Sequence, residues 1–292
     1  MFELRQYFLL FLTATIWGSG FVAQKLGVTA ISPFAFTFFR TFIGGLCLLP
    51  IIYFNYKRRH QMRYTSKKMV IYGGICCGFF LIIAESFQQY GLRYTDVNKA
   101  SFITALYMIF VPIIGIFMGH KINKKIVLCV AISTIGLYLF CMKPSSGYFF
   151  QIGDLLELIC AILFAFHILV IAYFINHVDG VLLSCTQFFA ASFMGLILML
   201  VTEIPTYQEL SNAFLPLIYV GIMSNGIAYT LQVVAQRGIS PTIASLILSL
   251  ESVMGAIFGV CFLSETMTER ELCGAALMFV AVILTQVKIK KL

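Results

Sequence analysis

The sequence predicts an all-α membrane protein with ten transmembrane helices, and three observations lead to this prediction. About 60% of the 292 residues are hydrophobic, and only 11% are charged. Soluble domains carry roughly 25% charged residues, and one soluble core could not hide so much apolar surface. The apolar residues also form long unbroken runs, which favour helices over the alternating strands of a β-barrel.

The apolar runs divide into ten segments, each close to the roughly 20 residues that a spanning helix needs. Pro33, Pro144, Pro205 and Pro241 fall at or near segment boundaries, where a missing backbone N–H costs little. The expected helices are 7–26, 34–54, 70–91, 100–119, 125–142, 154–174, 181–201, 213–235, 243–263 and 271–287.

The net charge of +8 is gathered in short loops, above all between Lys57 and Lys68 and between Lys288 and Lys291. Basic loops of this kind are typical of the cytoplasmic side of a membrane protein, and their position argues against a nucleic-acid partner. We therefore expect a multi-pass protein of the cytoplasmic (cell) membrane with both termini inside the cell.

An internal repeat divides the chain into residues 1–143 and 144–292. The stretch 84–136 resembles 228–280 at a shift of 144 positions, with matches such as Gln88 and Gln232. Each half would hold five helices, so the two halves must cross the membrane in opposite senses. Inverted repeats are typical of secondary transporters, whose substrate site lies near the midplane where the halves meet.

Short motifs along the chain carry a family resemblance. They are IWGSGF at 16–21, FR at 39–40, QQYGL at 88–92, KASFIT at 99–104, AFHIL at 165–169, AQR at 235–237, SP at 240–241, SLE at 249–251 and SE at 264–265. In this order they resemble the drug/metabolite transporter superfamily, in its ten-helix EamA-type branch.

The resemblance covers nearly the whole chain and implies two inverted EamA repeats that transport small organic metabolites. Relatives of this type include amino-acid exporters. One departure concerns the expected ninth helix, where the family often has proline after the glutamate and this chain has Ser252. Without that proline we expect a straighter helix over 243–263.

Glu251 is the clearest candidate for a site residue, because a charged side chain in mid-membrane costs at least about 2.5 kcal/mol and usually pairs or lines a cavity. It could be the counter-charge for a substrate amine or the acceptor of a coupled proton. Alternatively, it could be a structural group, paired with Arg40 or hydrogen-bonded by neighbouring hydroxyls.

Polar stripes occur at equivalent places in the two repeats. Glu85 and Gln88 share one face of their helix, and Asn225, Tyr229, Gln232 and Gln236 follow one face of the helix at 213–235. The shift of 144 pairs Glu85 with Tyr229 and Tyr107 with Glu251. We favour one shared aqueous cavity over interhelical hydrogen bonding, which contributes about 0.6 kcal/mol per contact.

Three further residues are candidates with a structural alternative. Arg40 could bind a substrate carboxylate, but a structural pair with a glutamate is favoured. His167 could relay a proton, but a hydrogen bond to a neighbouring helix is favoured. Trp17 could wall the cavity and stack on a cationic substrate, or it could simply pack.

These observations predict a secondary transporter of small polar metabolites that works by alternating access, most simply an exporter of amino acids or related solutes. The alternative is a transporter of organic cations such as quaternary amines. A membrane-embedded enzyme is disfavoured because it would need a clustered set of nucleophile, base or metal ligands, and the sequence shows no such set and no hydrolase or protease motif. We expect no cofactor and no metal, and the partners would be the substrate, the bilayer and a coupled proton or counter-substrate.

Overall fold

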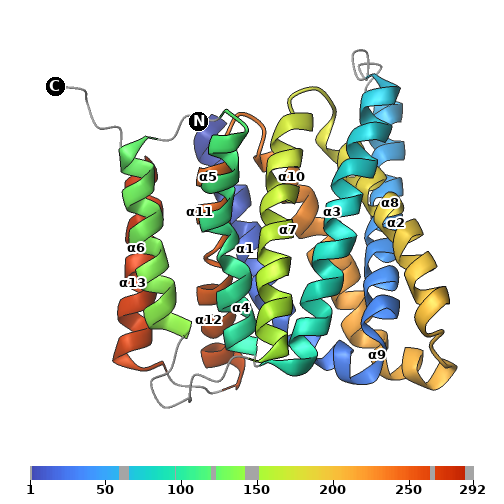
Figure 1. Ribbon diagram of the computed structural model, residues 1–292. Helices are drawn as coiled ribbons and strands as arrows, with labels where there is room; N and C mark the ends of the chain where they lie inside the picture. The colour runs from blue at the N-terminus through green and yellow to red at the C-terminus, as the bar shows by residue number, and fades with distance from the viewer. Residues whose placement is uncertain are drawn as a thin grey trace.

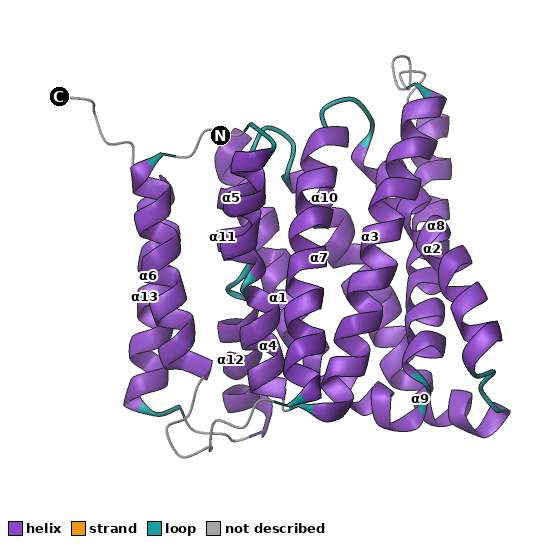
Figure 2. Ribbon diagram, viewed as in Figure 1, coloured by secondary structure: helices purple, strands orange, loops and turns teal. Residues whose placement is uncertain are grey.

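The computed structural model describes residues 2–58, 66–95, 97–119, 123–141, 151–263 and 267–286. Every regular element in these ranges is a helix, as Figure 2 shows. The all-α prediction is therefore confirmed. In chain order the helices are α1 (Phe2–Ala30), α2 (Pro33–Arg58), α3 (Lys67–Tyr94), α4 (Val97–Ala105), α5 (Tyr107–Phe117), α6 (Lys124–Cys141), α7 (Ile152–Phe174), α8 (Gly180–Thr202), α9 (Tyr207–Tyr219), the π-helix η1 (Val220–Tyr229), α10 (Thr230–Ala235), α11 (Pro241–Leu248), α12 (Glu251–Leu263) and α13 (Glu269–Gln286).

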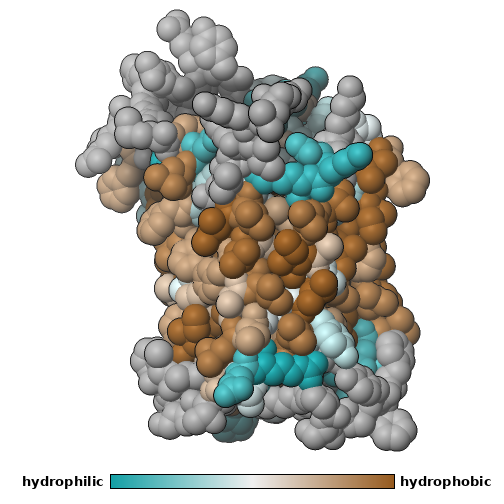
Figure 3. All heavy atoms as spheres, turned by 90° about the vertical axis from the view of Figure 1, so that its left-hand side faces the viewer, coloured by the Kyte–Doolittle hydropathy of each residue, from teal (hydrophilic) through white to brown (hydrophobic). Residues whose placement is uncertain are grey.

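The molecule has the surface expected of a membrane protein. Nine stretches of the described residues are long and apolar enough to cross a bilayer. The tenth expected span, α13, has three charged residues in its first turn and packs alongside α6. Figure 3 shows a broad hydrophobic band with polar side chains above and below it on the side that α6 and α13 face. Multi-pass membrane insertion follows from this band and these spans.

The two repeats run in opposite senses. Helix α1 begins at the upper end of the molecule in Figure 1, whereas α7, the first helix of the second half, begins at the lower end. The start of α1 and the end of α13 lie on the same side. The assignment of this side to the cytoplasm stays a prediction from the charge of the loops. Residues 59–65 of the basic loop lie outside the described ranges.

Two expected helices are interrupted, and the interruptions are equivalent in the repeats. The segment 100–119 is broken at Leu106 into α4 and α5, and the segment 243–263 is broken at Ser249 and Leu250 into α11 and α12. Leu250 follows Leu106 by the repeat shift of 144. The expectation of a straighter helix over 243–263 is therefore wrong.

The physical cause of both breaks is a tightened turn that needs no proline. The backbone N–H of Leu106 donates to the carbonyl of Ile103 at 3.1 Å, and that of Leu250 donates to Ile247 at 3.2 Å. Each bond reaches back three residues, as in a 3₁₀ turn, in place of the four of an α-helix. Each following helix then starts afresh, with Tyr107 or Glu251 as its first residue.

The segment expected at 213–235 is also irregular. It begins as α9, continues through the ten-residue π-helix η1, and ends as α10. π-helical turns are rare and occur frequently at functional sites. Here the π-helix carries Asn225 and ends at Tyr229.

Candidate functional site

A pocket opens inside the molecule, between helices of both repeats. Its walls come from α1, α2, α3 and the residues on either side of the α4–α5 break in the first half, and from α7, η1, α10 and α12 in the second. Seven of the candidate residues line it: Trp17, Arg40, Gln88, Tyr107, Tyr229, Gln232 and Glu251. The sequence proposed these residues from charge or polarity inside expected spans, from helical spacing and from the repeat, and the fold brings them together at one place.

Glu251 is the acidic group of this pocket. It is buried, and the hydroxyl of Tyr107 donates a hydrogen bond to its Oε1 at 3.1 Å. Among the described residues no Lys or Arg pairs with it. Because Glu251 is the first residue of α12, the partial positive charge of that helix N-terminus favours a negative group there.

A glycine contact holds α12 against α1 beside Glu251. A Cβ on Gly18 would lie 2.5 Å from the backbone nitrogen of Gly255 and 2.6 Å from the carbonyl oxygen of Glu251. Only glycine therefore lets the two backbones approach so closely. This approach brings Trp17 and Glu251 to the same pocket.

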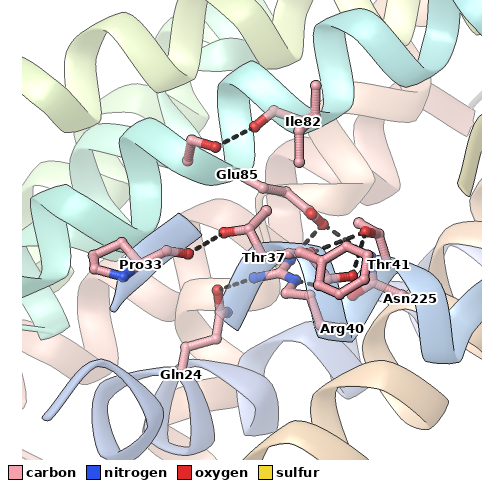
Figure 4. A network of polar contacts seen from close by, with 10 residues as sticks. Gln24, Pro33, Thr37, Arg40, Thr41, Ile82, Glu85 and Asn225 are labelled. Carbon is pink, nitrogen blue, oxygen red and sulfur yellow. Dashed lines mark hydrogen bonds and ion pairs between the residues drawn. The ribbon is translucent and has the colours of Figure 1, made fainter. Parts of the chain in front are cut away.

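Arg40 also lines the pocket, and its guanidinium is hydrogen-bonded to three protein side chains, as Figure 4 shows. Its Nη2 donates to Oε1 of Glu85 at 2.5 Å, its Nη1 to Oε1 of Gln24 at 2.7 Å, and its Nε to Oδ1 of Asn225 at 3.0 Å. Asn225 also donates to Oε1 of Glu85 at 3.1 Å. Arg40 therefore forms its ion pair with Glu85 and not with Glu251, which lines the pocket.

The position of Asn225 depends on the π-helix and on a second glycine. A Cβ on Gly44 would lie 2.7 Å from Cβ of Asn225, so α2 and η1 meet only because residue 44 has no side chain. Arg40 lies one turn before Gly44 on α2. The close contact therefore places the Asn225 amide next to the Arg40 guanidinium.

Aromatic rings form another wall of the site. The rings of Trp17 and Tyr229 lie 4.6 Å apart, and His167 meets Tyr229 at 6.0 Å. His167 is fully buried, with its Nε2 at 3.1 Å from Oε1 of Gln187 on α8. The structure thus places His167 behind the aromatic wall, in contact with a neighbouring helix.

Two polar atoms at the pocket have no protein partner among the described residues. They are Nε1 of Trp17 and Oε1 of Gln232, both on residues that line the pocket. Buried polar groups nearly always have partners, so unsatisfied ones usually mark bound water or a ligand. These two atoms have hydrogen-bonding capacity that no described residue uses.

Glu157 is an acidic residue that the sequence interpretation missed. It is fully buried on α7, and the hydroxyl of Thr104 donates to its Oε2 at 2.7 Å. Because Glu157 lies near the start of the expected helix 154–174, three residues after Asp154, its sequence position did not indicate that it is buried. A signal was present, because Glu157, Cys160, Phe164 and His167 follow one helical face at spacings of three, four and three.

Comparisons with known proteins agree with this architecture. Residues 4–142 and 151–287 each match the EamA-like transporter family, so both halves carry its repeat. The chain belongs to the EamA-like transporter family. Membership makes it a membrane transporter with a small-molecule substrate, and transporters are not enzymes.

Individual relatives extend the similarity over almost the whole EamA chain. An uncharacterized transporter of Archaeoglobus fulgidus is 30% identical over 280 residues, which is 95% of this chain and 84% of the relative. The uncharacterized transporter YoaV of Bacillus subtilis is 24% identical over 90% of both chains. A solved crystal structure at 16% identity superposes with a TM-score of 0.75 over 96% of both chains, which supports the fold alone.

Proposed function

We propose that this EamA protein is a secondary transporter that carries small solutes bearing a protonated amine, amino acids in the first place, by alternating access. The observation that carries the proposal is Glu251, a buried carboxylate without a cationic partner among the described residues, at a pocket between the two repeats. A buried charge needs compensation, and a substrate ammonium would supply it.

The rest of the pocket supports a small amine. Trp17, Tyr107 and Tyr229 lie around Glu251, and aromatic faces attract ammonium groups with about 0.5–2 kcal/mol. Nε1 of Trp17 and the amide of Gln232 can hydrogen-bond polar atoms elsewhere on the solute. Arg40 is occupied by three protein acceptors, so we assign it to the scaffold.

Alternating access follows from the inverted repeats and the broken helices. Two halves that exchange conformations would open the pocket first to one side and then to the other. The interruptions at Leu106 and Leu250 provide joints next to the pocket. We propose export as the direction, with both termini in the cytoplasm, in accord with the charge of the loops.

Flux from liposomes tests the proposal. Liposomes containing the purified protein are loaded with a mixture of the standard amino acids, ethanolamine and choline, and efflux is followed by mass spectrometry. We expect one or more primary amines to leave faster than from protein-free liposomes. Preferential efflux of choline would favour the second candidate, a carrier of quaternary amines, which the aromatic wall would also suit.

Glu251→Gln then tests the role of the carboxylate. The amide is nearly isosteric, so the protein should fold, but flux should fall about tenfold or more, because hydrogen bonds to charged groups contribute about 1.5–3 kcal/mol. Glu203→Gln makes the same chemical change at an exposed position and should leave flux unchanged. Equal flux in both variants would contradict the proposed role of Glu251.

A further inference from the structure

Two buried carboxylates near the pocket, those of Glu157 and Glu251, lack a cationic partner among the described residues. Oε1 of Glu157 has no hydrogen-bond partner there, and a Cβ on Gly91 would lie 2.5 Å from this oxygen. It therefore faces the backbone of α3 where a side chain would not fit. A buried anion in such surroundings is expensive, and binding a proton would remove the cost.

The two acids are joined through one short stretch of backbone. Thr104 donates to Oε2 of Glu157 at 2.7 Å, and Tyr107, three residues later, donates to Oε1 of Glu251 at 3.1 Å. The break at Leu106 lies between the two donors. Thr104 also lines the pocket, so Glu157 is one hydrogen bond behind the pocket wall.

The charged groups around Glu157 do not neutralise it. On its own helix, Asp154 lies one turn away and is paired with Lys99 of α4 at 2.5 Å. On α3, Glu85 is paired with Arg40. The phenol of Tyr107 on α5 is bound to Glu251, Cys160 is the neighbouring thiol on α7, and α11 has no ionisable side chain.

From this arrangement we infer that Glu157 is the proton-binding site of the transporter, separate from Glu251, and that it exchanges its proton for the substrate. In the empty pocket the Glu157 carboxyl holds a proton, so Glu251 is left as the anion near the cavity that has no cationic partner among the described residues, while Glu85 is paired with Arg40. An ammonium bound beside Glu251 adds positive charge, which stabilises an ionised Glu157. Its O–H bond then breaks, and the proton passes to water.

This exchange rests on the proposed transport of amines, and it makes the proton gradient the energy source for that transport. A proton entering the cell would drive one solute with a protonated amine outward. The stretch from Thr104 to Tyr107 couples proton release at Glu157 to substrate binding at Glu251. The hydrogen bonds to the two carboxylates come from either side of the same helix break at Leu106.

Infrared difference spectroscopy tests the proton site without any substrate. Purified wild-type protein is titrated from acid to alkaline pH, and the carbonyl stretch of protonated carboxyl groups is recorded. We expect the Glu157→Gln protein to lack one such band that wild type shows, and Glu203→Gln to keep it. Identical carboxyl bands in wild type and Glu157→Gln would overturn the inference.

A second variant covers the case in which Glu157→Gln does not fold. Thr104→Val keeps the shape of the side chain but removes the hydroxyl that donates to Glu157. The carboxyl band should then shift, because the carbonyl loses a hydrogen bond, and an unshifted band would count against the site.

Liposome transport tests the coupling, with the solute of highest flux in the mixture above as the probe. An acid interior should drive accumulation of that solute by wild type. In Glu157→Gln this accumulation should vanish, whereas exchange of labelled for unlabelled solute should continue. Accumulation driven equally well in both proteins, or driven only by an acid exterior, would overturn the exchange. Absence of any flux would refute the proposed function, while the infrared result would still decide the proton site.

Discussion

The hydroxyl of Tyr107 donates a hydrogen bond to Glu251 at 3.1 Å, and the two residues are equivalents in the repeats, 144 positions apart. Residues that are related by a pseudo-twofold axis and contact each other lie close to that axis. The contact therefore joins the two halves at their centre. Each partner is also the first residue after a helix break. Movement of one half relative to the other would therefore change the distance between the Tyr107 hydroxyl and the Glu251 carboxylate.

Tyr107→Phe should impair transport without unfolding the protein. The change removes a single hydroxyl whose bond to a carboxylate contributes about 1.5–3 kcal/mol. We expect kcat/KM for the transported solute to fall about tenfold in liposomes. Tyr173→Phe, at a position exposed on α7, is the matched control. Unchanged kcat and KM in Tyr107→Phe would show that the bond has no part in transport.

Arg40 and Glu85 should behave as a structural pair. Removing one partner of a buried ion pair leaves an uncompensated charge, which costs about 3–5 kcal/mol. We expect Arg40→Gln and Glu85→Gln each to lower the thermal unfolding temperature strongly in detergent. The double variant should unfold at a higher temperature than the two separate losses predict. Simple additivity would mean that the two side chains do not interact energetically.

Two neighbouring glycines on α1 should differ sharply in their tolerance of alanine. A Cβ at Gly18 would lie 2.5 Å from the backbone of Gly255, whereas a Cβ at Gly20 meets nothing within 4 Å. Gly18→Ala should push α12 away and reduce both stability and flux. Gly20→Ala should be tolerated, with a gain of up to about 1 kcal/mol in helix propensity. Similar flux and unfolding temperatures in the two variants would contradict this packing.

The orientation can be tested with an impermeant thiol reagent on intact cells. The background carries Cys273→Ser, because Cys273 is exposed. We expect Lys67→Cys, at the start of α3, to resist labelling until the membrane is opened. Gln208→Cys, exposed at the start of α9 on the opposite side (Figure 1), should react in intact cells. The reverse pattern would place both termini outside.

Much of the helical arrangement was predictable from composition. The expected segment 154–174 corresponds to α7 at Ile152–Phe174, and 181–201 to α8 at Gly180–Thr202. Long apolar runs predict spans reliably because only a helix satisfies its own backbone in lipid. The repeat shift also linked Tyr107 to Glu251, since it depends on sequence similarity alone.

The local irregularities were not predictable in this way. The breaks at Leu106 and Leu250 contain no proline, and the π-helix through Asn225 has an ordinary apolar sequence. A tightened or widened turn is stable only when neighbouring helices satisfy the displaced groups. Those neighbours are defined by the packed fold.

The amino-acid sequence was enough to predict the class of this protein, ten apolar segments, their inverted repeat and the set of polar residues that the membrane would have to accommodate. Which of those residues pair with one another became visible in the folded protein: Arg40 with Glu85, Tyr107 with Glu251, and Thr104 with Glu157. The reason is that lipid and protein core are both apolar, so hydrophobic periodicity only weakly indicates which face of a helix turns inward. Pairing depends on the rotation and contact of helices far apart in the chain, which glycines such as Gly18 and Gly44 set through close backbone approach.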